Sequence, residues 1–191
     1  MKFALFAAAM AAAFAAPAAV AQVDSVRLGV MAHNICVTDC KNANKESPVN
    51  IDGEVRFASP DWLKVIWSPH PYAMASVNTG GDTSFVAVGL EYDWQFARGW
   101  HFEPGFGYAL HDGKLNNKYA NGTPEAAAYF EDHVLLGSRD LFRTNLSLTW
   151  DVTERWGVQA LYEHLSHGQI LGHGRNQGLD ELGVRAVWKF N

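Results

Sequence analysis

The segment EHLSHGQILGHGRNQGLDELG, residues 163–183, contains three residue types that together can hydrolyse an ester. A serine hydroxyl such as that of Ser166 is a weak nucleophile until a neighbouring base accepts its proton. His164 lies two positions before Ser166 and can be that base, while Asp180 can hold the imidazole in the required tautomer. Glu181 is the competing acid. The three residues can act together only if their side chains share one surface. Whether they do depends on the strands and connections that carry them.

The chain repeatedly alternates apolar and polar residues, a pattern that is typical of half-buried strands. In one such run the even positions are Trp100, Phe102, Pro104, Phe106, Tyr108 and Leu110. We predict eight strands, at about 24–34, 49–58, 70–79, 83–97, 99–111, 134–151, 155–167 and 180–190, with a short helix at 61–66. An even number of long alternating strands favours an all-β fold, an eight-stranded antiparallel transmembrane β-barrel.

The strand at 155–167 determines which way the hydrolytic side chains point. Its even positions are apolar or aromatic: Trp156, Val158, Ala160 and Tyr162. His164 and Ser166 continue this series, so we expect them to face lipid, and Asp180 has the outward parity of the next strand. Glu181 has the opposite parity and should point inward. The alternative is that the three outward polar residues only lie at headgroup depth, where polar side chains are ordinary.

Donors for a developing oxyanion must lie close to the nucleophile. We expect them among His167, Gly168 and Asn176, either as backbone amides or as side chains.

Tryptophan positions separate a membrane barrel from a soluble, lipocalin-like barrel with an inward apolar face. The residues lie beside alternate connections or near the C-terminus: Trp62, Trp67, Trp94, Trp100, Trp150, Trp156 and Trp188. In an up-and-down barrel these places share one rim, which fits an interfacial aromatic girdle on the periplasmic side. The connections near 35–48, 79–82, 112–133 and 168–179 should then face outward from the cell.

The strand positions that face inward carry charged residues, which can pair with one another inside a narrow barrel. They are Arg27, Glu54, Arg56, Glu91, Asp93, Glu103, Arg143, Glu163, Arg185 and Lys189. Because eight strands leave room for side chains and little else, we expect no pore.

Residues 1–21 have the pattern of a secretory signal peptide, which leaves residues 22–191 as one outer-membrane barrel domain. Cys36 and Cys40 are the only cysteines, and in an exported chain they favour a disulfide. A metal site there would need more ligands than nearby His33, and the other histidines show no metal-ligand spacing, so we expect no metal or cofactor. The net charge of −5 without a basic patch argues against nucleic acid as a partner.

The segment HLSHG…NQGLDELGVR resembles the active-site region of the PagL family, outer-membrane lipid A 3-O-deacylases. EPGFGYALHDG, LGSRDLFR and the stretch from GEVRF to GGDTSF also look like family segments, so the resemblance covers most of the mature chain. It implies a barrel with a Ser–His–acid triad on its outer surface and no metal, with Ser166, His164 and Asp180 at the matching positions. Two residues depart from the common family pattern. His167 stands where the family commonly has Asn, and Asp180 stands where the family often has Glu.

The resemblance implies a serine carboxylic-ester hydrolase that removes the 3-linked acyl chain of lipid A in the outer leaflet of the outer membrane. Its partner would be lipopolysaccharide, and a homodimer is compatible with such a barrel. Two alternatives stay open. One is a non-catalytic structural or adhesive barrel whose loops at 35–48 and 112–133 carry the function. The other is an esterase or phospholipase that uses the same site on another lipid.

Overall fold

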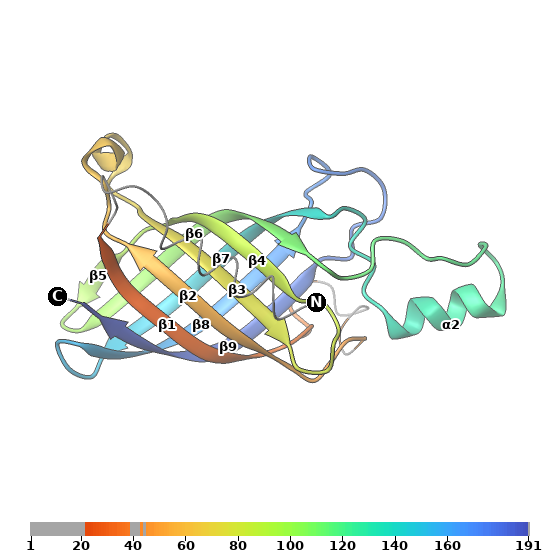
Figure 1. Ribbon diagram of the computed structural model, residues 1–191, viewed down its shortest axis with the longest axis horizontal. Coiled ribbons are helices and arrows are strands. Elements are labelled where there is room, and N and C mark those ends of the chain that lie inside the picture. The colour runs from red at the N-terminus through yellow and green to blue at the C-terminus, as the bar shows by residue number, and fades with distance from the viewer. Residues whose placement is uncertain (1–21, 39–42, 44, 191) are drawn as a thin grey trace.

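The structure, a computed structural model, describes residues 22–38, 43 and 45–190 (Figure 1). The predicted signal peptide and Cys40 lie outside the described residues. The elements, in chain order, are β1 (Val23–Ala32), β2 (Val49–Phe57), η1 (Asp61–Ile66), β3 (His70–Asn78), β4 (Phe85–Glu91), β5 (Trp94–Ala97), β6 (Trp100–His111), α2 (Pro124–Asp132), β7 (Asp140–Asp151), β8 (Trp156–Ser166) and β9 (Leu179–Lys189).

The strands form one antiparallel sheet that closes on itself. Apart from β4 and β5, strands that are neighbours in sequence pair with each other, and the pairings of β1 with β9 and of β4 with β6 complete the ring. β4 and β5 both pair with β6, and the register of β4 continues as far as Gln95 before it shifts at Ala97. The two are therefore halves of a single barrel strand interrupted at Tyr92 and Asp93. The result is the closed eight-stranded antiparallel barrel that the sequence predicts, with one predicted strand, 83–97, broken in the middle.

The two faces of the barrel wall have opposite chemistry, because successive side chains of a strand point to opposite sides. The outer face is apolar and exposed, as at Leu28, Val88, Phe106, Leu146 and Val184. The inner face carries buried charges. A soluble barrel with an apolar interior is therefore excluded, and the outward apolar belt fits a hydrocarbon environment.

Ion pairs occupy part of the interior, and an apolar core cluster that includes Met74, Phe85 and Leu141 occupies another part. Arg27 Nη1 lies 2.9 Å from Glu54 Oε1 and 2.6 Å from Glu91 Oε1, and its Nη2 lies 2.7 Å from Glu103 Oε1. Arg185 Nη1 extends the network, at 2.9 Å from Glu54 Oε2. Eight of the ten predicted inward charges are buried: Arg27, Glu54, Arg56, Glu91, Glu103, Arg143, Glu163 and Arg185. Asp93 and Lys189 are partly exposed, and each is ion-paired, with Arg56 and Asp151 respectively.

Two features at the α2 end differ from the sequence prediction. The connection after β6 contains α2, which projects beyond the barrel (Figure 1) and begins where Thr123 accepts a hydrogen bond from the Ala126 N–H. β7 begins at Asp140 rather than near residue 134. Val134, Leu135 and Leu136 are fully buried, and Val134 and Leu136 join the apolar core cluster. A buried apolar run in a connection has the same composition as a buried strand. This explains why the sequence predicts that β7 begins near residue 134.

The predicted aromatic girdle gathers at the opposite end. Trp100 and Trp150 are direct cross-strand partners with stacked rings 6.1 Å apart, and the Trp156 and Trp188 rings meet edge to face at 4.2 Å. The predicted short helix is present as η1, a 3-10 helix that also lies at this end (Figure 1). Most of these indoles are exposed, as an interfacial position requires.

Candidate active site

His164 and Asp180 form a direct pair on the outer wall, near the α2 end of the barrel. They face each other across the β8–β9 ladder, and Nδ1 of His164 lies 2.7 Å from Oδ1 of Asp180. The carboxylate side chain is only 4% exposed, while that of the imidazole is 26% exposed. With Nδ1–H donated to the acid, Nε2 is left as the proton acceptor, which is the tautomer that a catalytic base needs.

Asp180 is covered by two further side chains. The hydroxyl of Tyr162 donates to Oδ1 at 2.9 Å from the same outward series of β8. Thr38, from the connection after β1, donates to Oδ2. The sequence alone identifies neither residue. Tyr162 resembles an ordinary lipid-facing aromatic residue, and Thr38 lies 142 residues from Asp180 in the chain.

Ser166 occupies the outward position predicted for it, two residues beyond His164 on β8, and is partly exposed. Within the described residues its hydroxyl makes no hydrogen bond, so the Ser–His contact of a working triad is not closed here. Catalytic hydrogen bonds are often long or poorly aligned before substrate binds. The arrangement thus joins the candidate base and acid directly and places Ser166, the candidate nucleophile, on the same face.

The three residues expected to stabilise an oxyanion have different roles in the structure. Both ring nitrogens of His167 are engaged by its own connection: Nε2 donates to the Arg175 carbonyl at 2.8 Å, and Nδ1 accepts from the Gln169 N–H at 3.1 Å. The ring is buried and organises residues 168–178. Gly168 is exposed directly after it. Asn176 accepts the His167 N–H through Oδ1 at 3.3 Å, which leaves its amide nitrogen as a donor.

Gly178 is a site residue that the sequence analysis missed. Its φ of +64° is in the left-handed region, and a Cβ there would lie 2.9 Å from Cε1 of His164. The glycine therefore provides the space in which the imidazole ring sits. A glycine two residues before the acid was the available signal, but only the folded connection shows what it contacts.

Glu181, the competing acid, points into the barrel as its parity predicts. Its Oε1 lies 2.6 Å from Nδ1 of His33 and accepts from Asn50 at 2.7 Å. His33 also contacts Glu46, with 3.2 Å between Nε2 and Oε2. Burial acts to lower the pKa of His33, but the hydrogen bonds to Glu181 and Glu46 outweigh it and raise that pKa to about 9. Glu181 is therefore part of the interior network and not of the outer site.

Cys36 is disulfide-bonded. Its predicted partner, Cys40, lies outside the described residues, so the Cys36–Cys40 pairing stays a prediction.

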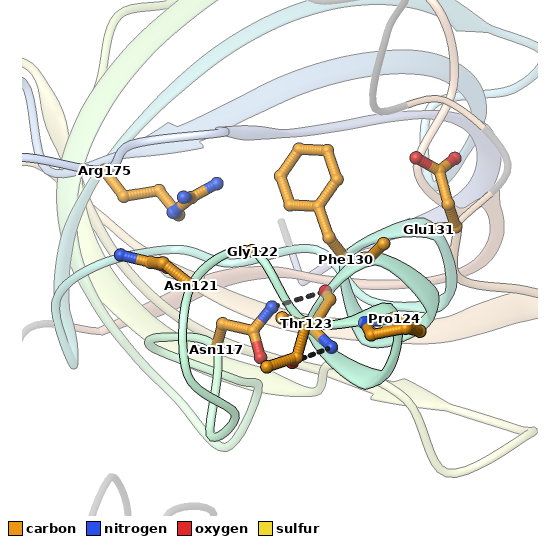
Figure 2. A pocket seen from close by; sticks show the side chains of 10 residues that line it. Asn117, Asn121, Gly122, Thr123, Pro124, Phe130, Glu131 and Arg175 are labelled. Carbon is orange, nitrogen blue, oxygen red and sulfur yellow. Dashed lines mark hydrogen bonds between the residues drawn. The ribbon is translucent and has the colours of Figure 1, made fainter.

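A separate open groove of about 580 Å³ lies beside α2 (Figure 2). Its lining includes Asn117, Thr123, Phe130 and Arg175, and the Arg175 guanidinium lies 5.1 Å from the centre of the Phe130 ring. None of the proposed hydrolytic residues lines it. Because Arg175 directly precedes Asn176, the groove adjoins the connection that completes the outer site.

Across the part of the chain that the structure describes, no cluster of three or more His, Cys, Asp or Glu residues is arranged to hold a metal ion. No helix within that part is long and apolar enough to cross a membrane.

The closed barrel with an apolar outer wall places the protein in the class of small outer-membrane β-barrels. Its fold matches the crystal structure of the outer membrane enzyme PagL with a TM-score of 0.60 and 14% identity, over 87% of this chain and 99% of that one. A de novo designed transmembrane β-barrel matches with a TM-score of 0.51 and 10% identity, over 88% and 96% of the respective chains. No curated protein sequence matches the chain.

The family model described as PagL, lipid A 3-O-deacylase, matches residues 51–189. The chain therefore belongs to the PagL family of lipid A 3-O-deacylases, which confirms the resemblance noted in the sequence.

Proposed function

We propose that the protein hydrolyses the ester-linked acyl chain at the 3-position of lipid A in the outer leaflet, through Ser166, His164 and Asp180. The observation that carries this proposal is the 2.7 Å contact between His164 and Asp180 on the lipid-facing wall. Ionisable side chains on a lipid-facing wall cost free energy, so their presence there suggests a function. Ser166 is the nearest nucleophilic side chain in the outward-facing series of β8. Family membership supplies the substrate class.

In the first half of the reaction, Oγ of Ser166 attacks the ester carbonyl carbon while Nε2 of His164 takes the hydroxyl proton. Asp180 stabilises the imidazolium that forms. When the tetrahedral intermediate collapses, the bond between the carbonyl carbon and the sugar oxygen breaks, and His164 gives its proton to that oxygen. The products of this half are the deacylated sugar and an acyl ester on Ser166.

In the second half, a water molecule attacks the acyl-enzyme. His164 takes a proton from this water and later returns it to Oγ of Ser166, so a free fatty acid leaves and the enzyme is restored. The oxyanion of both intermediates needs fixed donors. Gly168 N–H and the side-chain amide of Asn176 serve this role, since the ring of His167 is committed to the connection.

The outer wall beside Ser166 suits an acyl chain. Its direct partner on β7 is Phe142, whose ring lies 5.3 Å from that of Phe106 on β6. These aromatic side chains extend the apolar surface sideways from the nucleophile. The substrate ester can therefore reach Ser166 from the bilayer while its chain stays in contact with apolar groups.

The decisive experiment is mass spectrometry of lipid A from outer membranes that carry the wild-type protein or Ser166→Ala at equal abundance. We expect loss of one hydroxyacyl chain with the wild type only. Ser84→Ala, in the connection between β3 and β4, is the matched control and should act like the wild type. Fully acylated lipid A in all samples would reject the proposal. Release of fatty acid from phospholipid instead would indicate an esterase of different specificity.

A further inference from the structure

The connection that follows β1 reaches across to the start of β9. The N–H of Ile35 donates to the Asp180 carbonyl at 2.9 Å, so this stretch lies alongside the backbone of the acid. Three residues later, Thr38 reaches the outer wall and meets the Asp180 side chain. A connection that is remote in sequence thus forms part of the site on β8 and β9.

Thr38 makes two hydrogen bonds to one carboxylate oxygen. Its backbone N–H and its Oγ1–H both donate to Oδ2 of Asp180, each at 2.7 Å. The other oxygen, Oδ1, accepts from Tyr162 and faces Nδ1 of His164. Each carboxylate oxygen therefore has two contacts. Because Thr38 holds Oδ2, it also sets the direction of Oδ1, the oxygen that faces His164.

This division of contacts fixes the rotation of the carboxylate. The torsion that turns an Asp carboxylate is soft and roughly two-fold, so the side chain alone does not select which oxygen faces the imidazole or at what angle. Two donors on Oδ2 remove that freedom. Oγ1 of Thr38 also lies 3.3 Å from Nδ1 of His164, so the hydroxyl lies beside the His164–Asp180 contact.

We propose that Thr38 is a positioning residue: it holds the Asp180 carboxylate so that Oδ1 stays aligned with His164. Its hydrogen bonds go to the acid, Asp180, and its hydroxyl also lies 3.3 Å from Nδ1 of the base, so it acts through these two residues and not on the ester. This inference rests on the proposed function for its kinetic consequence, whereas the ordering of the His164–Asp180 contact can be measured without substrate.

The test uses full-length protein refolded in detergent micelles. Thr38→Val keeps the side-chain shape and the backbone donor but removes the hydroxyl, whereas Thr38→Ser keeps the hydroxyl. Thr79→Val is the matched control, because Thr79 donates its hydroxyl to Val49 O in another connection at the α2 end. Each variant is checked for folding by heat-dependent gel mobility. Two quantities are measured: kcat and KM for lipid A deacylation, and solvent exchange of the His164 Nδ1 proton by NMR.

We expect Thr38→Val to lower kcat about tenfold with KM unchanged, because one hydrogen bond to a charged group is lost. The Nδ1 proton should exchange with water about tenfold faster. Thr38→Ser should restore both quantities, and Thr79→Val should leave both as in the wild type.

Wild-type exchange of the Nδ1 proton in a folded Thr38→Val variant would overturn the positioning role, whether or not lipid A is deacylated. A rise in KM alone would also overturn it and would indicate a substrate contact. If wild-type protein releases no acyl chain, the proposed function fails, but the exchange rates still decide the role of Thr38. The two failures are therefore distinguishable.

Discussion

Asp180 and Glu181 are consecutive residues that each pair with a histidine on opposite faces of the barrel wall. Asp180 contacts His164 outside at 2.7 Å, and Glu181 contacts His33 inside at 2.6 Å. Strand alternation alone separates them, because neighbouring side chains of β9 point to opposite sides. Asp180 lies beneath the partly exposed His164 on the outer wall, whereas Glu181 is enclosed with the interior charges.

This pairing predicts opposite effects from two isosteric changes. Asp180→Asn should reduce kcat by several orders of magnitude, because an amide cannot stabilise the imidazolium and favours the wrong tautomer. The variant should still fold, although an Asn amide cannot accept all the hydrogen bonds that Thr38, Tyr162 and His164 make to the Asp180 carboxylate. Glu181→Gln should leave kcat within a few-fold and lower the urea midpoint, because His33 loses its closest anion. Activity assays and urea titrations on both variants check this, and an inactive but stable Glu181→Gln would reverse the assignment.

The pair of His33 with Glu181 predicts a loss of barrel stability at alkaline pH. The folded pKa of His33, about 9, lies above the unfolded value of 6.5, so its contribution is fully present below about pH 6.5 and is lost as pH rises through 9. The maximum effect is on the order of 3 kcal/mol. Urea unfolding between pH 6 and pH 10 measures it.

His33→Gln should flatten that pH dependence, while His173→Gln, in an exposed part of the connection after β8, should retain it. Glu46 acts at the other end of the range. Burial acts to raise its pKa, but hydrogen bonds from His33 and Thr83 lower it below 4.5 overall. The contribution of Glu46 to barrel stability is therefore present above about pH 4.5 and is lost as the pH falls through its lowered folded-state pKa. A wild-type profile that stays flat through pH 9 would contradict the role of His33.

The close approach of Gly178 to His164 predicts a steric effect on this proposed base. Gly178→Ala puts a methyl group 2.9 Å from Cε1 of His164 and should displace the ring, with a loss of kcat of tenfold or more. Gly174→Ala is the matched control, since Gly174 also has a positive φ, +92°, yet a Cβ there meets nothing within 4 Å. Both variants carry backbone strain, so only a contact effect distinguishes them. Equal kcat in the two would show that the space beside the ring is not needed.

The interior ion pairs predict a large cost for removing their central cation. Arg27→Met leaves Glu54, Glu91 and Glu103 buried without it and should destabilise the barrel by about 3–5 kcal/mol. Lys64→Met breaks the exposed pair with Asp61 on η1 and should change nothing measurable. Urea midpoints of the two variants in the same detergent provide the comparison. Equal midpoints would mean that the interior charges are replaceable without loss.

The sequence by itself determined the barrel and the side each strand residue faces. Alternation over long runs fixes both, because a strand has a two-residue period and one wrong step would turn every apolar side chain inward. The same rule put His164, Ser166 and Asp180 outside and Glu181 inside. It also put the charges inside the barrel. The tryptophans were placed at one end by a different feature, their positions beside alternate connections.

Only the tertiary structure decided what surrounds those residues. Alternation gives the face of a side chain but not its neighbours from other connections, so it does not show that Thr38 contacts Asp180 or that the space at Gly178 holds the ring of His164. The pattern of Val134, Leu135 and Leu136 predicts a strand, because burial in a connection and burial in a sheet select the same apolar residues. The ring of His167 was likewise committed to its connection by contacts that form only when residues 168–178 close over it. Such contacts join segments far apart along the chain, and a local period carries no information about them.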